Sequence, residues 1–204
     1  MMPEVRRLVE AHKILREGSK GPDPHNAVLK SAVVFLCATW EIYCESVALE
    51  AATKISEAKI DPQELPEAMQ WQIKVLVHDA DVQKSKPLSL AGDGWRKVVV
   101  EVAEKFCDAL NTPKSKPIDE LFQKSIGLKK LSGSWTHCRS EIDSFGAVRG
   151  DIAHMGADAP KVSKEEILHY LSIISKSITD TDNAVYDHLK HANLLGKAPW
   201  QKTN

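Results

Sequence analysis

The segment that most constrains the fold runs from about residue 23 to 57 and carries apolar residues at helical spacing throughout. Asp23-Pro24 supplies a capping residue followed by proline, which is a common start of an α-helix. The apolar surface is wider than that of an ordinary amphipathic helix, so this helix is expected at the centre of a bundle or against a second subunit. Its main stripe is Leu29, Val33, Leu36, Cys37, Trp40, Tyr43, Cys44, Val47, Ala51 and Ile55. The additional apolar residues are Val34, Phe35, Ala38 and Ile42.

Helical periodicity continues along the chain, and no segment shows the alternation typical of a strand. Capping boxes are expected at Asp61 with Glu64 and at Ser163 with Glu166, and Gly127 is expected to end a helix. The fold class is therefore all-α, a single-domain bundle of about seven helices. The other expected helices span about 3–16, 67–82, 95–110, 117–126, 134–154 and 163–196, with a loop at 84–94. We divide the chain into an N-terminal helix and linker (1–23), a helical domain (24–195) and a flexible tail (196–204).

Composition narrows the functional classes. The chain has 204 residues, a net charge of −1 and a pI near 6.7. Proteins that coat nucleic acid non-specifically carry a large positive excess, so any nucleic-acid role here must depend on a local site. No apolar run of signal-peptide type and no stretch of 18 uninterrupted apolar residues occurs, so no membrane span is expected and the location is expected to be cytoplasmic. The cysteines are Cys37, Cys44, Cys107 and Cys138, interpreted as small core residues.

Three other features have a functional and a structural interpretation. Between residues 114 and 139 six basic residues oppose two acidic ones, a surplus that could contact phosphates but is more often a solvated face. His188 and His191 have a spacing that can hold a metal, yet no other ligand cluster lies near them, and surface histidines are expected. The tryptophans at 40, 71, 95 and 135 are interpreted as helix anchors rather than as a base-stacking platform.

The segment 134–157, SWTHCRSEIDSFGAVRGDIAHMGA, places Arg149 and His154 near the end of one expected helix, with Ser132 or Ser134 as its cap. Arg149 lies within the apolar stripe of that helix, and a guanidinium on an inward face needs an anionic or hydrogen-bonding partner. A cation that cannot be neutralised, near a side chain that titrates close to pH 7, suits phosphate chemistry. The stripe is Trp135, Cys138, Ile142, Phe145 and Ile152.

A structural interpretation of these residues is also open. An Arg on a helix face usually makes a salt bridge, and a His near a helix C-terminus often complements the helix dipole. Glu41, at the margin of the long apolar stripe, is the best candidate anion for Arg149, although it could equally be a rim residue. Arg149 and Glu41 could also form a buried ion pair in a purely structural bundle.

Most chemical motifs are absent, including glycine-rich phosphate loops, HExxH, GxSxG and EF-hand loops. The segment VRGDIAHMG resembles the R-x4-6-H motif of HEPN domains, and from about residue 27 to 189 the chain resembles the RiboL-PSP-HEPN branch. The resemblance rests on the order of three segments: SAVVFLCATWEIYCESV with its embedded Glu41, NTPKSKPIDELFQKSIGL, and Arg149 to His154 followed by a helix starting near Ser163.

This resemblance implies a helical bundle that dimerises so that two motifs form a composite active site. Active HEPN proteins are metal-independent endoribonucleases of defence, toxin–antitoxin and RNA-processing systems, with RNA as substrate and no metal or cofactor. They cleave by attack of the ribose 2′-OH and leave a 2′,3′-cyclic phosphate and a 5′-OH. His154 would then act as general base or acid, Arg149 would stabilise the phosphate, and Glu41 would orient one of them.

One departure from the family pattern concerns the residue after the arginine. That position is commonly polar, often Asn, whereas Gly150 stands here and Asp151 follows. Asp151 could supply the polar contact, but a carboxylate close to a phosphate would also repel it. A catalytically silent HEPN module that binds RNA or a partner protein, for example an antitoxin, is therefore the alternative.

Overall fold

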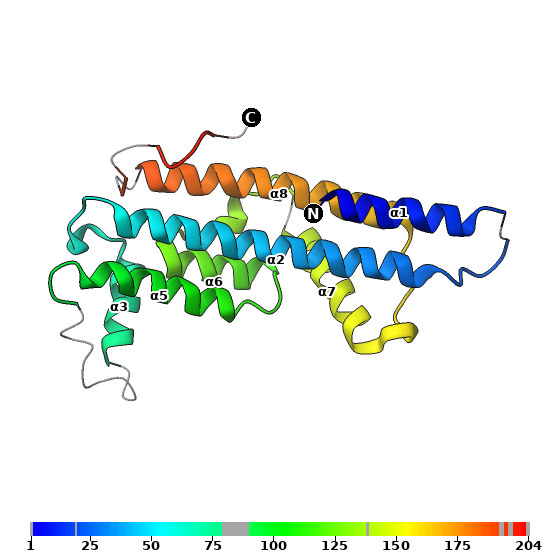
Figure 1. The fold of residues 1–204 in the computed structure, drawn as a ribbon, viewed down its shortest axis with the longest axis horizontal. Helices are drawn as coiled ribbons and strands as arrows, with labels where there is room; N and C mark the ends of the chain where they lie inside the picture. The colour runs from blue at the N-terminus through cyan, green and yellow to red at the C-terminus, as the bar shows by residue number, and fades with distance from the viewer. Residues whose placement is uncertain are drawn as a thin grey trace.

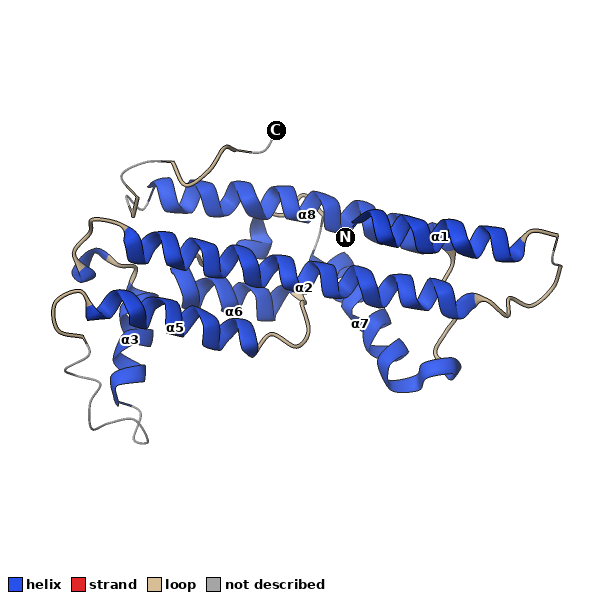
Figure 2. Cartoon of the chain, in the orientation of Figure 1, coloured by secondary structure: helices blue, strands red, loops and turns tan. Residues whose placement is uncertain are grey.

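A computed structural model of the protein describes residues 2–18, 20–78, 90–137, 139–191, 194–195 and 198–202. Within these ranges the chain forms seven α-helices, three short 3-10 helices and no strand, which confirms the all-α prediction (Figure 2). The α-helices are α1 (Met2–Arg16), α2 (Asn26–Glu57), α3 (Glu67–His78), α5 (Gly94–Asp108), α6 (Ser115–Ile126), α7 (Arg139–Met155) and α8 (Lys164–His191). The 3-10 helices are Pro62–Glu64, Leu131–Ser134 and Gly156–Asp158.

The long apolar helix α2 is the centre of the bundle, as its wide apolar surface predicts. It contacts α1, α5, α6, α7 and α8. In Figure 1, α8 lies alongside α2 and runs in the same direction, whereas α1 runs antiparallel to it. Its five neighbours bury the inward stripe of α2, so α2 organises a single hydrophobic core.

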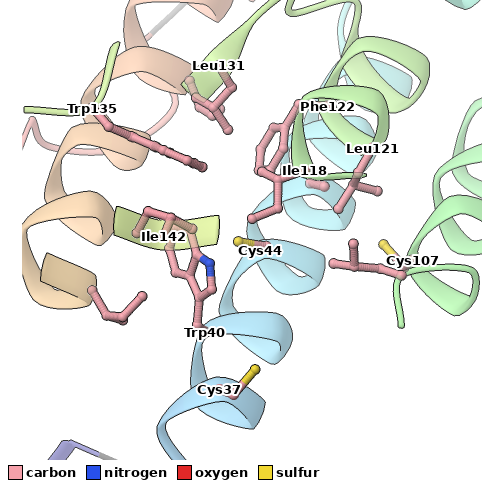
Figure 3. Close-up of a cluster of buried hydrophobic side chains, with 14 of the residues drawn as sticks. Cys37, Trp40, Cys44, Cys107, Ile118, Leu121, Phe122, Leu131, Trp135 and Ile142 are labelled. Carbon is pink, nitrogen blue, oxygen red and sulfur yellow. The ribbon is translucent and has the colours of Figure 1, made fainter. Parts of the chain in front are cut away.

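Trp40 is the largest side chain in the middle of this core. It is fully buried, and its indole Nε1 donates a hydrogen bond to the carbonyl of Pro113 at 3.1 Å. The edge of its ring meets Trp135 at a centroid distance of 5.7 Å. Figure 3 shows Trp40 in one buried cluster with Ile142 of α7 and with Ile118, Leu121 and Phe122 of α6. Trp40 therefore links α2 to the α5–α6 connection and to the segment that precedes α7.

Part of the apolar surface of α2 remains uncovered. Val34, Phe35 and Ile42 are 39%, 47% and 47% exposed. By length and composition alone α2 could also cross a membrane, although no span was expected from the sequence. Half of its most apolar 18-residue window is buried inside the bundle, and a single helix of this kind is weak evidence for a membrane span.

Two helix starts differ from the prediction because tertiary contacts redirect the capping residues. Helix α2 begins at Asn26, because the Asp23 carboxylate accepts a hydrogen bond from the His25 amide at 2.9 Å and lies 2.8 Å from His12 Nε2 on α1. Helix α6 begins at Ser115, before the predicted position 117. Its first turn is capped from α7, where Asp143 accepts hydrogen bonds from the Ser115 amide and hydroxyl at 2.7 and 2.9 Å.

The prediction of one helix from residue 134 onward is wrong at its beginning. Trp135 precedes α7, which starts at Arg139, and its buried indole Nε1 donates to Thr181 Oγ1 at 3.0 Å. Ser132 does not cap α7, since its amide and hydroxyl donate to Asp119 on α6, both at 2.7 Å. Trp135 has the helical spacing of the apolar stripe of α7, but it lies before the helix starts. Its indole nitrogen instead donates a hydrogen bond to α8.

Several side-chain placements also need correction. Trp71, predicted to anchor a helix, is 56% exposed. His188 is half-buried rather than on the surface, and its Nε2 donates to the Ile126 carbonyl at 2.8 Å. Trp200, in the expected tail, packs against the core.

The predicted helix caps and helix ends that depend only on neighbouring residues are confirmed. Both capping boxes form, with Asp61 and Glu64 bonded reciprocally and Ser163 bonded to Glu166 in the same way. Gly127 ends α6 in the left-handed conformation at φ 78°. The cysteines at 37, 44 and 107 are buried and free, as expected for core residues. Cys138, residues 79–82 of the expected third helix and residues 84–89 of the expected loop lie outside the described ranges.

Candidate functional site

Arg149 lies on the side of α7 that faces α2. The burial of Cys37 raises the pKa of its thiol to about 11, the positive charge of Arg149 opposes that rise, and the negative charge of Glu41 adds to it. These three side chains must therefore lie within electrostatic range of one another between α7 and α2. The helical wheel predicts this neighbourhood of Arg149 and Glu41.

Arg149 and Glu41 are neighbours without forming a direct ion pair. Burial raises the pKa of the Glu41 carboxyl, and the nearby Arg149 charge only partly offsets that effect. Across the residues that the structure describes, the Arg149 guanidinium makes no hydrogen bond and no carboxylate oxygen lies within 4.0 Å of it. Both side chains are half-buried. The guanidinium donors are therefore open to an external anion.

The other predicted site residues lie on the solvent side of α7. His154 and Asp151 are exposed, and a Cβ added to Gly150 would meet nothing within 4 Å. A residue two positions after Arg149 points about 200° away on a helix, and one five positions after points about 140° away. Within one chain the fold thus brings Glu41 to Arg149 but leaves His154 and Asp151 facing outward.

The turn that follows His154 is fixed by a buried lysine that the sequence interpretation missed. Lys30 is 9% exposed, and its ammonium donates to the carbonyls of Gly156, Ala157 and Ala159 at 3.1, 3.0 and 2.7 Å. These carbonyls are negative dipole ends at the end of α7, so they replace an acidic partner for the cation. The sequence did contain a signal for this contact, because Lys30 lies on the buried stripe of α2, one helical turn before Val33 and Val34. A lysine in that position needs a hydrogen-bonding partner.

A second missed lysine lies against α7 one turn before Arg149. The stem of Lys114 crosses Gly146, where an added Cβ would lie 2.9 Å from Lys114 Cγ. Its ammonium has no hydrogen bond or ion pair with any described residue. The lysine belongs to the basic run 114–139, which the sequence allowed to contact phosphates but favoured as a solvated face.

Carboxylates also surround this region. Burial raises the pKa of Glu45, one turn after Glu41, and the charges of Glu41 and Asp108 raise it further. No group of three or more His, Cys, Asp or Glu side chains that could hold a metal ion occurs in the described ranges. The electrostatic environment of Arg149 is therefore mixed, since Glu41 lies within range of its guanidinium and Glu45 lies within range of Glu41.

An all-α bundle with a central apolar helix, and an Arg-x4-His motif on a helix packed against it, defines a HEPN domain. The family model described as RiboL-PSP-HEPN matches residues 4–187, and the chain belongs to this family. Membership points to a ribonuclease or an RNA-binding module. Comparisons with curated proteins and with solved structures found no match.

Proposed function

We propose that the protein is a metal-independent endoribonuclease of a defence, toxin–antitoxin or RNA-processing system, working in the cytoplasm as a homodimer with a composite active site. The observation that carries this proposal is the half-buried guanidinium of Arg149, which has no anionic partner within 4.0 Å among the described residues. Its charge lies within electrostatic range of Glu41, and an exposed histidine, His154, follows five residues later on the same helix.

The proposed reaction needs only general acid–base catalysis and charge stabilisation. His154 of one copy takes the proton of the ribose 2′-OH, and O2′ bonds to phosphorus. The bond between phosphorus and O5′ breaks as O5′ receives a proton from the protonated His154 of the second copy. The products are a 2′,3′-cyclic phosphate and a 5′-OH. Arg149 binds the scissile phosphate and stabilises the negative charge that develops on its oxygens. Glu41 acts as a positioning residue for the guanidinium.

The outward direction of His154 supports a site shared by two chains. Within one chain His154 points away from Arg149, so a second copy is needed to place two histidines and two arginines around one phosphate. Helix α2 offers a surface for that copy, because Phe35 and Ile42 remain 47% exposed. An open groove of about 610 Å³ continues this surface past Val34 to Ile152 and the turn at Gly156. Apolar patches of this kind are typical of protein interfaces.

The assembly is tested by placing a charge on this surface. Ile42→Asp is expected to convert a dimer to a monomer in light scattering, because the carboxylate would be desolvated at the interface. Leu168→Asp, at a comparably exposed apolar residue of α8, is the matched control and should remain dimeric. A wild-type protein that is monomeric at micromolar concentration contradicts the composite site.

The chemistry is tested with RNA cleavage in the presence of a chelator. Arg149→Ala and His154→Ala should each lose at least about 100-fold in cleavage rate while their circular dichroism and dimerisation stay unchanged. His191→Ala, which removes an exposed histidine from α8, should cleave like wild type. Cleavage by His154→Ala at the wild-type rate would exclude the assignment.

The second candidate is a catalytically silent module that binds RNA or a partner protein such as an antitoxin. Glu41, Glu45 and Asp108 favour it, because their shared charge would repel a phosphate approaching Arg149. This candidate predicts RNA or partner binding that depends on Arg149, with no cyclic phosphate product at any enzyme concentration.

A further inference from the structure

A groove between α3 and α6 lies outside the candidate catalytic site and has a volume of about 1140 Å³. Its lining includes Trp71 from α3 and four lysines, which are Lys74, Lys116, Lys124 and Lys129. The Trp71 indole is 56% exposed although such a large aromatic ring would normally be buried. The groove therefore combines an open aromatic face with positive charge.

The charges of the groove are not fully neutralised within the protein. Its acidic lining residues are Glu67, Asp119 and Glu120. Asp119 accepts hydrogen bonds from the Ser132 amide and hydroxyl, and Glu120 pairs with Lys124, which lowers the pKa of the Glu120 carboxyl.

Three of the four lysines in the groove remain without a carboxylate partner. The ammonium groups of Lys116 and Lys129 have no hydrogen bond and no ion pair within 4.0 Å in the described ranges, although the charge of Lys116 helps to lower the pKa of Glu120. The Lys74 ammonium lies 5.1 Å from the Trp71 ring centroid. These cations can contact a polyanion without first breaking an ion pair.

We propose that this groove binds single-stranded RNA, with a base stacked on Trp71 and the neighbouring phosphates on Lys74, Lys116 and Lys129. Aromatic rings and lysines in one groove form the usual arrangement for single strands, since every base has a stacking face and every linkage a negative charge. The Lys74 ammonium lies over one face of the indole, so the base would stack on the other face while Lys74 reaches a neighbouring phosphate.

The path of the chain connects this groove to the candidate catalytic helix. Helix α6 contacts α3 and α7. Lys116 lines the groove, while Lys114, two residues earlier, lies against Gly146 of α7. A strand in the groove could therefore pass the start of α6 and continue towards Arg149. This connection rests on the proposed function, and it favours RNA over an acidic peptide as the occupant.

Binding is measured apart from cleavage in the His154→Ala background, with fluorescence anisotropy of a labelled oligouridylate. Lys116→Ala/Lys129→Ala should weaken binding at least about tenfold and reduce the slope of log K against log salt by about 1.4, as expected for two lost phosphate contacts. Lys97→Ala/Lys105→Ala removes the same charge from exposed positions on α5 and should change neither. Equal effects of the two double variants overturn the groove assignment.

Stacking is tested separately from charge. Trp71→Ala should weaken binding about tenfold, whereas Trp71→Phe retains an aromatic face and should recover most of the affinity. Unchanged affinity in Trp71→Ala overturns the stacked base. Poly-glutamate that displaces the oligouridylate as effectively as unlabelled RNA would instead identify a site for acidic proteins and overturn the RNA assignment.

The same groove variants in the otherwise wild-type enzyme distinguish this inference from the proposed function. The expected result is a higher KM for RNA with little change in kcat, because the groove holds the strand away from the reacting phosphate. If the enzyme cleaves RNA and both constants stay unchanged, the groove inference fails and the nuclease stands. If the enzyme does not cleave but the anisotropy results hold, the nuclease fails and the groove stands.

Discussion

Lys114, at the start of α6, packs so closely on Gly146 of α7 that a Cβ on the glycine would lie 2.9 Å from Lys114 Cγ. The lysine cannot easily move aside, because Asp143 holds the next residue, Ser115, by its amide and hydroxyl. Gly146 is therefore required by this contact, although glycine weakens a helix interior. The contact keeps a lysine beside α7, one turn from Arg149.

Gly146→Ala should destabilise the protein. The better helix propensity of Ala contributes about 1 kcal/mol, while overpacking against the lysine stem costs about 1–3 kcal/mol. We expect the free energy of unfolding in urea to fall by up to about 2 kcal/mol. Gly150→Ala is the matched control on the same helix, and with open space around it should gain up to about 1 kcal/mol. In a Lys114→Ala background Gly146→Ala should no longer destabilise. Equal shifts for the two glycines would contradict the packing argument.

Lys30→Met should loosen the end of α7. The methionine keeps the apolar stem but leaves the carbonyls of Gly156, Ala157 and Ala159 without their donor, at a cost of about 2–3 kcal/mol. Because this turn follows His154 directly, RNA cleavage at a temperature where the variant remains folded should also decrease. Lys105→Met, on the exposed side of α5, should alter neither unfolding nor cleavage. A Lys30→Met protein with wild-type stability would show that these bonds contribute nothing.

Glu41→Gln should raise stability while lowering activity. The pKa of Glu41 is raised in the folded state, so the folded protein binds the proton more tightly than the unfolded chain does. Ionisation therefore disfavours folding above the folded-state pKa, and this penalty disappears as the pH falls below the ordinary value of 4.5. Glu41→Gln should melt above wild type at pH 7, with the difference shrinking towards pH 4, while cleavage falls if Glu41 positions Arg149. A lower melting temperature at pH 7 would support a stabilising ion pair instead.

His188 should make stability depend on mildly acidic pH. Burial lowers the pKa of its imidazole below the ordinary value of 6.5, although the hydrogen bond to the Ile126 carbonyl works against that. The unfolded chain then takes up the proton first, so the stabilisation is complete above pH 6.5 and is lost as the pH falls towards the folded-state pKa. Wild type should lose more of its melting temperature between pH 7.5 and 5 than His188→Gln does. His191→Gln controls for loss of an exposed imidazole, and parallel curves for wild type and His188→Gln would refute the effect.

The helices were predictable where the interactions that form them are local. The stripe of α2 from Leu29 to Ile55 is inward because apolar residues recur every three to four positions, and Gly127 ends α6 because the left-handed conformation favours glycine. The start of α7 was not predictable in this way. Trp135 continues the apolar spacing of α7, yet its indole nitrogen donates a hydrogen bond to Thr181 on α8. The residue therefore lies outside α7, which begins at Arg139.

The candidate site was predictable in part for the same reason. The wheel positions of Arg149 and Glu41 imply inward-facing charges on two apolar helices, and the fold brings these charges close together. The contacts of Lys30 and Lys114 could not be predicted from neighbouring residues. Each lies on a partner that is distant in sequence, the turn at Gly156 for one and Gly146 for the other.

The sequence by itself determined an all-α bundle with a central apolar helix, and an Arg-x4-His motif on a helix facing it, because periodicity, capping and family motifs are properties of neighbouring residues. Tertiary structure alone decided that Arg149 and Glu41 approach without an ion pair, that Lys30 secures the turn after His154, and that Trp71 stays exposed beside lysines. The physical reason is that burial and pairing depend on side chains brought together across the bundle, over 126 to 129 positions in the case of Lys30.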